Sequence, residues 1–325
     1  MRIAIEGGRT AMATTTTTTT TTTRADDARR RLLGLRRGSG AWGYRRRTAP
    51  ASEPSALAGL ALLATDGSAA GPGRDAAVGA GRWLASSRGA DGSVGVTAAL
   101  PAPGWPTPFA ALLWAALGGF AAERSAATGW LLASRGKPVP RVADDPMGHD
   151  TRLIGWPWVA ETHSWVEPTA AALLALAREG QAGHPRAREG VRVLLDRAIP
   201  GGGWNLGNPV VFGTTLRPLP GPTGLALLAL ARVDGPSPAI AAAIAYLREA
   251  LLGTLAPASM GWGLLGLRAW GAAPAWAADR LAAATERASS REPSTAELAL
   301  LLLAGGGRSL EVLGVAPRGE GAPDA

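Results

Sequence analysis

Six stretches rich in alanine and leucine recur along the chain, and each one begins at or just after a proline. Proline suits the first turn of a helix, because its fixed φ angle is already helical and the N–H group that it lacks has no partner there. A helix that is apolar on every side must also be covered on every side. The pattern therefore predicts buried inner helices, which begin near Pro54, Pro108, Pro168, Pro222, Pro257 and Pro293.

Between these stretches lie more polar segments in which apolar residues recur at helical spacing. In the fourth of them, Ile240, Ile244 and Leu247 form one stripe while Arg248 faces elsewhere. The amphipathic segments are 75–87, 123–134, 185–197, 237–252 and 274–288. We expect an all-α fold, an α/α toroid of about six helical hairpins over residues 41–312, because only a closed ring covers both faces of the inner helices.

The two ends of the chain lack this pattern. Ten threonines run from Thr14 to Thr23, and such a run has no apolar face to bury, so residues 1–40 are expected to form a disordered, basic leader. Residues 313–325 are expected to form a disordered tail. No apolar segment typical of a secretory signal follows the first residues, which favours a cytoplasmic protein.

The formal net charge of +8 is concentrated in the leader rather than in the predicted toroid. Residues 24–47 hold nine arginines against Asp26 and Asp27, and together with residues 1–23 they account for the whole excess. A neutral folded domain gives no electrostatic reason to expect nucleic acid, whereas the arginine cluster could contact an anionic membrane surface weakly. The longest apolar run, residues 108–122, is too short to span a bilayer, so no transmembrane segment is expected.

Glycine-rich loops follow two of the outer helices, DGSVG at residues 91–95 and GGGWNLG at residues 201–207. Together with the Pro-Ser/Thr starts of the inner helices, these loops resemble the squalene-cyclase and protein-prenyltransferase superfamily over about residues 41–312. The resemblance implies an α/α toroid whose apolar central cavity opens at the N-terminal ends of the inner helices and takes isoprenoids. Cyclases of that type protonate a polyene, and prenyltransferases join a prenyl diphosphate to a protein thiol.

The catalytic motifs of that superfamily are not reproduced in this chain. Its cyclases use an Asp-x-Asp-Asp motif whose middle aspartate donates the proton, and the nearest string here is Val142-Ala143-Asp144-Asp145, with valine in the first position. Its protein prenyltransferases hold zinc with Asp, Cys and His, and this chain contains no cysteine. We therefore expect no metal and no cofactor.

The longest gap between inner helices, residues 144–167, concentrates candidate site residues and leads into the third inner helix. Asp144 or Asp145 could supply an acid if burial raises its pKa, and the faces of the tryptophans could stabilise a carbocation. The alternative is an ordered loop in which the tryptophans only pack and the charges are solvated. The candidate binding residues of this segment are Trp156, Trp158, Glu161, His163 and Trp165.

Glutamate precedes three of the inner-helix prolines, at Glu53, Glu167 and Glu292. At equivalent helix starts these side chains would ring the mouth of the cavity and could bind a cation or act as acid and base, with Glu167 as the catalytic candidate. The alternative is stabilisation of the helix dipole, worth about 0.3–1 kcal/mol each. Trp204, in the second glycine-rich loop, is a further candidate for ligand binding, or it packs across a repeat junction.

Three functions remain open on the sequence. An isoprenoid-binding or isoprenoid-converting toroid should show a deep aromatic cavity with a sequestered acid. A non-catalytic toroid for a ligand or a partner is favoured by a filled centre. A carbohydrate-active α/α barrel should show exposed tryptophan faces and two carboxylates about 5–10 Å apart. A metal site would draw on His149, Asp150, Glu161 and His163, but these lack the spacing of a helical zinc motif.

Overall fold

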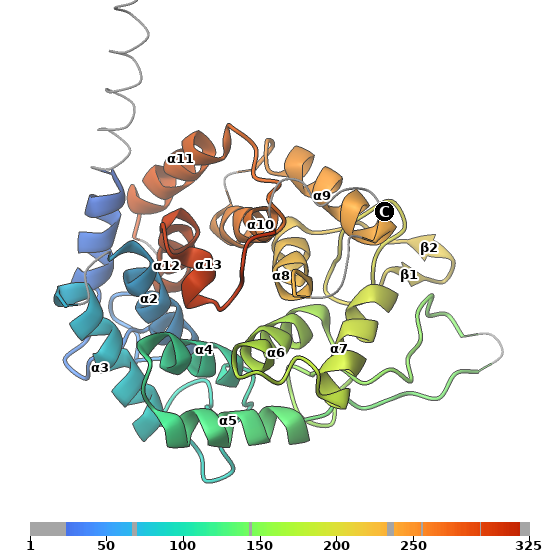
Figure 1. The fold of residues 1–325 in the computed structure, drawn as a ribbon, viewed down its shortest axis with the longest axis horizontal. Helices are drawn as coiled ribbons and strands as arrows, with labels where there is room; N and C mark the ends of the chain where they lie inside the picture. Colours follow the sequence, from blue (N-terminus) through green and yellow to red (C-terminus); the bar gives the residue numbers. More distant parts are fainter. Residues whose placement is uncertain are drawn as a thin grey trace, which may run out of the picture.

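Helices alternate between an inner and an outer position around one ring (Figure 1). The computed structural model describes residues 24–66, 70–142, 145–232, 237–254, 256–292 and 294–318. The inner helices are α2 (Ser52–Thr65), α4 (Thr107–Leu117), α6 (Val166–Arg178), α8 (Pro220–Leu230), α10 (Pro257–Ala269) and α12 (Thr295–Gly305). The outer helices are a helix at residues 24–34, α3 (Pro72–Ser86), α5 (Ala121–Ala133), α7 (Pro185–Asp196), α9 (Pro238–Ala250) and α11 (Ala277–Ser289). The predicted α/α toroid is therefore confirmed.

The inner helices close into a ring, because α12 packs against α2 as the others pack against their neighbours. In α2 every residue from Pro54 to Ala64 is buried, whereas in α3 the buried side chains, such as Ala77 and Leu84, lie on one face. A helix that is apolar all round and a helix with one apolar stripe thus take the inner and the outer layer respectively.

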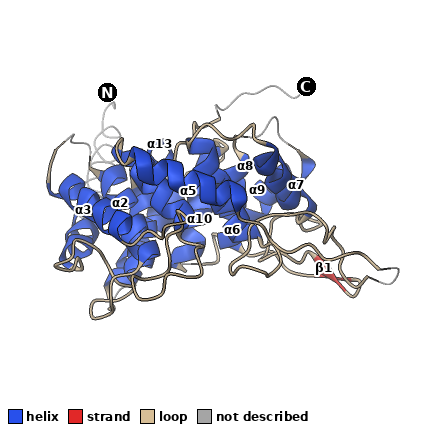
Figure 2. Ribbon diagram, turned by 90° about the horizontal axis from the view of Figure 1, so that it is seen from below, coloured by secondary structure: helices blue, strands red, loops and turns tan. Residues whose placement is uncertain are grey.

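The connections divide between the two faces of the ring. Figure 2 shows that the long connections leading from outer to inner helices gather on one face, which we call the loop face. The connection between α7 and α8 holds the short antiparallel strands β1 (Val210–Val211) and β2 (Thr214–Thr215). The small helix α13 (Ser309–Val312) follows α12 on the opposite face. The N-terminal ends of the inner helices, which we call the mouth of the ring, therefore point toward the loop face.

The predicted disordered leader is wrong for residues 24–40. Residues 24–34 form the first outer helix, in which Ala28 and Leu32 are fully buried, and Leu35 follows on the same side. These three residues recur at helical spacing among the arginines, so the basic segment carries a hidden apolar stripe. Residues 1–23 lie outside the described residues.

The predicted tail is likewise wrong at its beginning. Leu313 and Val315 are buried, and the Arg318 side chain donates a hydrogen bond to the Ala231 carbonyl at 2.9 Å. The packed chain therefore extends beyond residue 312, and residues 319–325 lie outside the described residues.

A tryptophan in the loop and a hydroxyl in the following helix hold the repeat junctions together. The Trp204 indole N–H donates to the carbonyl of Leu194 in the outer helix at 2.6 Å, and the Trp204 amide donates to Thr223 Oγ1 in the inner helix at 2.9 Å. The same two bonds recur at Trp42 with Leu32 and Ser55, and at Trp156 with Leu131 and Thr169. This recurrence gives a structural role to the serine or threonine that follows the helix proline in α2, α6 and α8 and to three of the twelve tryptophans.

Candidate active site

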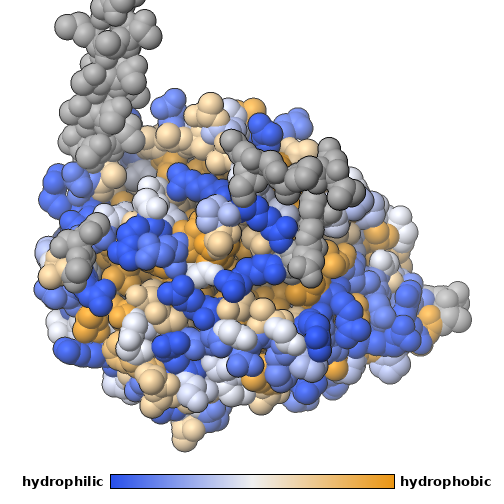
Figure 3. All heavy atoms as spheres, viewed as in Figure 1, coloured by the Kyte–Doolittle hydropathy of each residue, from blue (hydrophilic) through white to orange (hydrophobic). Residues whose placement is uncertain are grey.

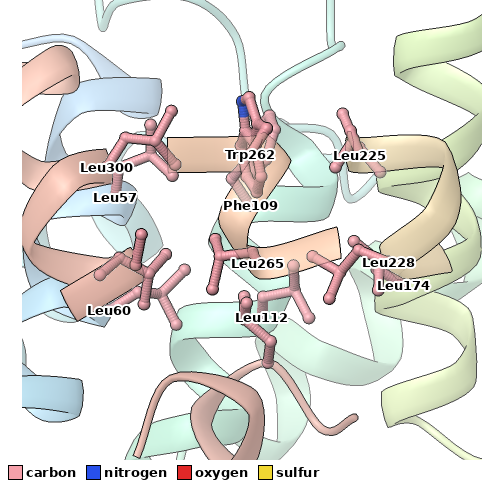
Figure 4. Packing of buried hydrophobic residues seen from close by; sticks show 14 of the residues in the cluster. Leu57, Leu60, Phe109, Leu112, Leu174, Leu225, Leu228, Trp262, Leu265 and Leu300 are labelled. Carbon is pink, nitrogen blue, oxygen red and sulfur yellow. The ribbon is translucent and has the colours of Figure 1, made fainter. Parts of the chain in front are cut away.

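The centre of the ring is filled by side chains (Figure 4). Phe109 of α4 and Trp262 of α10 stack across it with ring centroids 6.1 Å apart and an interplanar angle of 29°. Buried leucines surround the pair in two layers, namely Leu57, Leu60, Leu112, Leu174, Leu225, Leu228, Leu265 and Leu300. In the described part of the chain, packed side chains thus occupy the place where the resemblance implied an apolar central cavity.

Two glycines explain why the ring is narrow on the side of Trp262. A Cβ atom at Gly224 of α8 would lie 2.3 Å from the main chain of Trp262, and one at Gly266 of α10 would lie 2.5 Å from the Gly224 carbonyl oxygen. Only glycine permits two helix backbones to approach this closely. The contact brings α8 and α10 together and sets Trp262 beside Phe109.

A tyrosine and a glutamate are joined at the mouth of the ring. The Tyr44 hydroxyl donates a hydrogen bond to Glu53 Oε2 at 2.8 Å. The loop that carries Tyr44 is fixed there because the amide of Thr295, at the start of α12, donates to the Tyr44 carbonyl at 2.9 Å. Burial raises the pKa of the Glu53 carboxyl, and the bond from Tyr44 offsets part of that rise. Burial, followed by the charge of Glu53, also raises the pKa of the Tyr44 hydroxyl.

A second carboxyl group, that of Glu167 in α6, lies within reach of the charge of Glu53. Burial raises the pKa of Glu167, and the charge of Glu53 raises it further. The two glutamates occupy the first turns of α2 and α6, where each helix dipole favours a negative charge. Burial and mutual repulsion oppose that preference, so ionisation of one carboxyl favours the protonated form of the other.

This arrangement has the chemistry of a proton donor. A carboxyl group with a raised pKa keeps its proton at a higher pH than an exposed one and can act as a general acid. In the centre of the ring, the faces of Phe109 and Trp262 carry negative π density, which stabilises a cation. Of the predicted ring of glutamates, Glu53 and Glu167 lie near enough for the charge of Glu53 to raise the pKa of Glu167.

The third predicted glutamate, Glu292, is placed elsewhere. Its side chain is exposed and lines a separate cavity of about 470 Å³ whose other charged residues are Arg30, Arg31, Arg46 and Arg291. Because α12 begins at Thr295, Glu292 precedes the helix instead of lying in its first turn.

The predicted aspartate acid is placed far from the mouth. Asp145 accepts a hydrogen bond from the Met147 amide at 2.9 Å and pairs with Arg141 at 3.5 Å. The adjoining Gly148 amide donates to the carbonyl of Val210 in β1, at the outer edge of the ring (Figure 1). Asp144 lies outside the described residues.

Two of the predicted binding tryptophans are junction residues. Trp156 is 2% exposed and Trp204 is fully buried, and both indole N–H groups are bonded to main-chain carbonyls. The guanidinium of Arg186 also lies 3.8 Å from the centre of the Trp156 ring. These contacts give both side chains a packing role.

Trp158 and Glu161 line a groove on the loop face. The groove has a volume of about 590 Å³ and is also lined by Asp91, Trp105 and Trp130. Trp105 and Trp158 meet edge to face with centroids 5.1 Å apart. Hydrogen bonds from the Ser93 side chain and amide lower the pKa of Asp91, so this carboxylate is a turn residue rather than an acid.

The remaining predicted residues, Trp165 and His163, lie side by side just before α6, with ring centroids 4.5 Å apart. Burial, followed by the charge of Arg197, lowers the pKa of His163. The same two causes lower the pKa of the buried His149 to about 4. Within the described ranges, no group of three or more His, Cys, Asp or Glu side chains is placed to hold a metal ion.

Sequence reasoning missed Tyr44, Phe109 and Trp262. Phe109 and Trp262 are aromatic residues inside helices of alanine and leucine, which was a usable signal. Tyr44 follows a Trp-Gly pair in a loop, and nothing in that pattern indicates a bond to Glu53.

Comparison with known proteins supports the fold. No family model and no curated protein sequence matches the chain. Among solved structures, the apo form of the type II terpene cyclase MstE from Scytonema is similar with a TM-score of 0.54 and 18% identity, covering 81% of this chain and 77% of that chain. A variant of that cyclase in complex with its substrate, geranylgeranyl dihydroxybenzoate, gives a TM-score of 0.57 at 18% identity, covering 85% and 80%.

A protein from Actinoplanes is similar to the same extent, with a TM-score of 0.57 and 20% identity over 86% of this chain and 82% of that chain. At 18% to 20% sequence identity, this structural similarity establishes the fold alone. The chain has the α/α toroid of the type II terpene cyclases.

Proposed function

We propose that this protein is a terpenoid-cyclase-like toroid that binds an isoprenoid chain at the mouth of the ring and protonates it with Glu167. The observation that carries the proposal is the placement of Glu53 and Glu167 in the first turns of two inner helices, where burial raises the pKa of both and the charge of Glu53 adds to the rise at Glu167. The substrate class is supported by the similar fold of a cyclase solved with a geranylgeranyl substrate.

The reaction would begin when the protonated carboxyl of Glu167 transfers its proton to one carbon of an alkene. The other alkene carbon becomes cationic, and the electron pair of a second alkene in the chain attacks it to close a ring. Loss of a proton from carbon to the Glu167 carboxylate then ends the sequence, so that the product is an isomer of the substrate. Glu53, fixed by Tyr44, favours the protonated form of Glu167 through its charge.

The filled centre sets a condition on this reaction. A long isoprenoid chain can enter the ring only if the stacked rings of Phe109 and Trp262 separate. The same filled centre favours a second candidate function, a non-catalytic toroid that holds only the end of an apolar ligand at the mouth. The two candidates differ in whether the ligand leaves chemically changed.

The test is incubation of the full chain in D₂O with squalene or with geranylgeranyl dihydroxybenzoate, followed by chromatography and mass spectrometry. Cyclisation by the proposed acid gives an isomer of the substrate in which one carbon-bound hydrogen is replaced by a deuterium from the solvent. The Glu167→Gln variant should turn over at least about 100-fold more slowly, which is the usual contribution of a general acid. The Glu249→Gln variant, altered at an exposed position of α9, is the matched control and should retain full activity.

The same experiment distinguishes the two candidate functions. A bound substrate seen by native mass spectrometry, without any deuterated product, would establish the non-catalytic toroid. Full turnover by the Glu167→Gln variant would exclude Glu167 as the acid. A chain that neither binds nor converts any isoprenoid offered would overturn both candidates.

A further inference from the structure

Exposed hydrophobic side chains are concentrated on the loop face. Phe212, at the tip of the β1–β2 hairpin, is 81% exposed, and Val142 is 67% exposed. Of the large hydrophobic residues exposed in the described part of the chain, all but Leu195 belong to outer-to-inner connections, and Leu195 lies in the last turn of α7, which runs into the loop face. The residues in the connections are Leu100, Val139, Val142, Val159, Leu206, Phe212, Leu216, Leu219 and Leu252.

Arginines gather on the same face beside the mouth. Residues 35–51 contain five arginines and no acidic residue, and all five side chains are exposed, namely Arg36, Arg37, Arg45, Arg46 and Arg47. The Arg37 guanidinium donates to the Arg46 carbonyl at 2.9 Å, which holds the two parts of this basic loop together. The loop also carries Tyr44, whose bonds to Glu53 and Thr295 fix it at the mouth.

The opposite face is different. It also carries arginines, but Arg178, Arg232, Arg268 and Arg318 donate hydrogen bonds there to main-chain carbonyls. Its inner-to-outer connections hold none of the exposed large hydrophobic residues of the described chain. Figure 3 views this opposite face, on which hydrophilic side chains are widespread and apolar ones show between them. Among the described residues, the combination of arginines with large, strongly exposed apolar side chains is therefore found on the loop face.

This combination selects the kind of partner. A nucleic acid would be bound by the arginines alone, and exposed valine, leucine and phenylalanine would gain nothing from a phosphate backbone. A stable protein interface has a continuous, closely packed apolar centre, whereas these apolar residues are spread over separate connections. A lipid bilayer accommodates both groups, because its phosphates attract arginine and its acyl region accepts scattered apolar side chains.

We propose that the loop face binds peripherally to the surface of an anionic phospholipid bilayer, with the basic loop at the phosphates and Phe212 inserted among the lipids. Among the described residues no helix is long and apolar enough to cross a membrane, so the contact is made by loops. In this orientation the mouth of the ring faces the lipid, which is where an isoprenoid chain would be dissolved. The proposal concerns lipid binding alone and does not depend on the acid chemistry of Glu167.

The test is co-sedimentation of the full chain with vesicles of phosphatidylcholine alone or with about one third phosphatidylglycerol. Binding should require the anionic lipid and should weaken as salt is raised, because surface charges are screened. Changing Arg45, Arg46 and Arg47 together to Gln should weaken binding roughly 100-fold, since each arginine near the surface contributes about a fivefold factor. The Phe212→Ser variant should weaken binding to the same vesicles at every salt concentration.

A matched control tests whether the location of the arginines matters, and not only the loss of three positive charges. Changing Arg188, Arg192 and Arg248 to Gln removes the same charge from exposed positions on the outer helices α7 and α9 and should change binding less than about threefold. Circular dichroism establishes that each variant is folded. The proposal is overturned if neutral vesicles bind equally well, if the control triple variant weakens binding as much as the loop variant, or if no vesicle binds.

Discussion

At the start of α6, two polar residues flank one proline and have opposite surroundings. Thr169, after Pro168, is fully buried and accepts a hydrogen bond from the Trp156 amide at 3.0 Å. Glu167, before the proline, is kept in a partly buried position where the charge of Glu53 opposes its ionisation. Thr169 has its hydrogen-bond partner and stabilises a repeat junction. Glu167 is kept where burial and a nearby charge raise its pKa, which is common at functional sites. The same contrast separates Ser55 from Glu53 in α2.

The largest effect expected from this comparison is at the junctions. The Trp204→Ala variant should lose about 3–5 kcal/mol of unfolding free energy, because it removes a fully buried indole and leaves a cavity. Chemical denaturation followed by circular dichroism measures the loss. Trp158→Ala serves as the control, and its loss should be less than half as large because Trp158 is half-buried in the groove. Equal losses would show that junction tryptophans have no special role.

A smaller effect is expected when only the junction hydroxyl is removed. Thr223→Val keeps the shape of the side chain but leaves the buried Trp204 amide without its acceptor, which costs about 1–3 kcal/mol. Thr223→Ser restores the acceptor and should recover most of the stability. Differential scanning calorimetry of the three proteins decides the matter. If valine and serine are equivalent, the hydroxyl contributes only its volume.

The ring could be predicted from the sequence because its pattern is local. Proline, a hydroxyl residue and a run of alanine and leucine specify an inner helix without reference to the rest of the chain. The convergence of Glu53 and Glu167 could be predicted for the same reason, since both lie in first turns. Glu292 was misplaced because α12 begins at Thr295, and helix starts are defined by sequence only to within a residue or two.

The filled centre could not be predicted in the same way. It depends on the contact of Gly224 with Gly266 across two neighbouring helices and on the stack of Phe109 with Trp262 across the ring. Both contacts join residues that are distant in the sequence. Tyr44 was missed because its role depends on a loop that folds back over the mouth.

The smallest expected effect is the pH dependence of stability that Glu167 causes, and it tests the raised pKa at the mouth directly. The pKa of Glu167 is raised in the folded chain, so the folded state binds more protons than the unfolded state between the two pKa values. Stability from this group is therefore fully present below about pH 4.5 and is lost as the pH rises through the folded pKa, with a slope of at most about 1.4 kcal/mol per pH unit. Glu167→Gln should remove this decline and should be more stable than the wild type at neutral pH.

Glu53→Gln sharpens the test because it keeps Glu167 and removes the charge that acts on it. The pKa of Glu167 should then fall toward its ordinary value while staying above it, since burial is the larger cause of the rise. Carboxyl titration by NMR in the wild type and in Glu53→Gln measures this shift directly. A pKa of Glu167 that does not move would mean that the two carboxyl groups act independently, and the contrast between the two sides of the helix proline would then rest on burial alone.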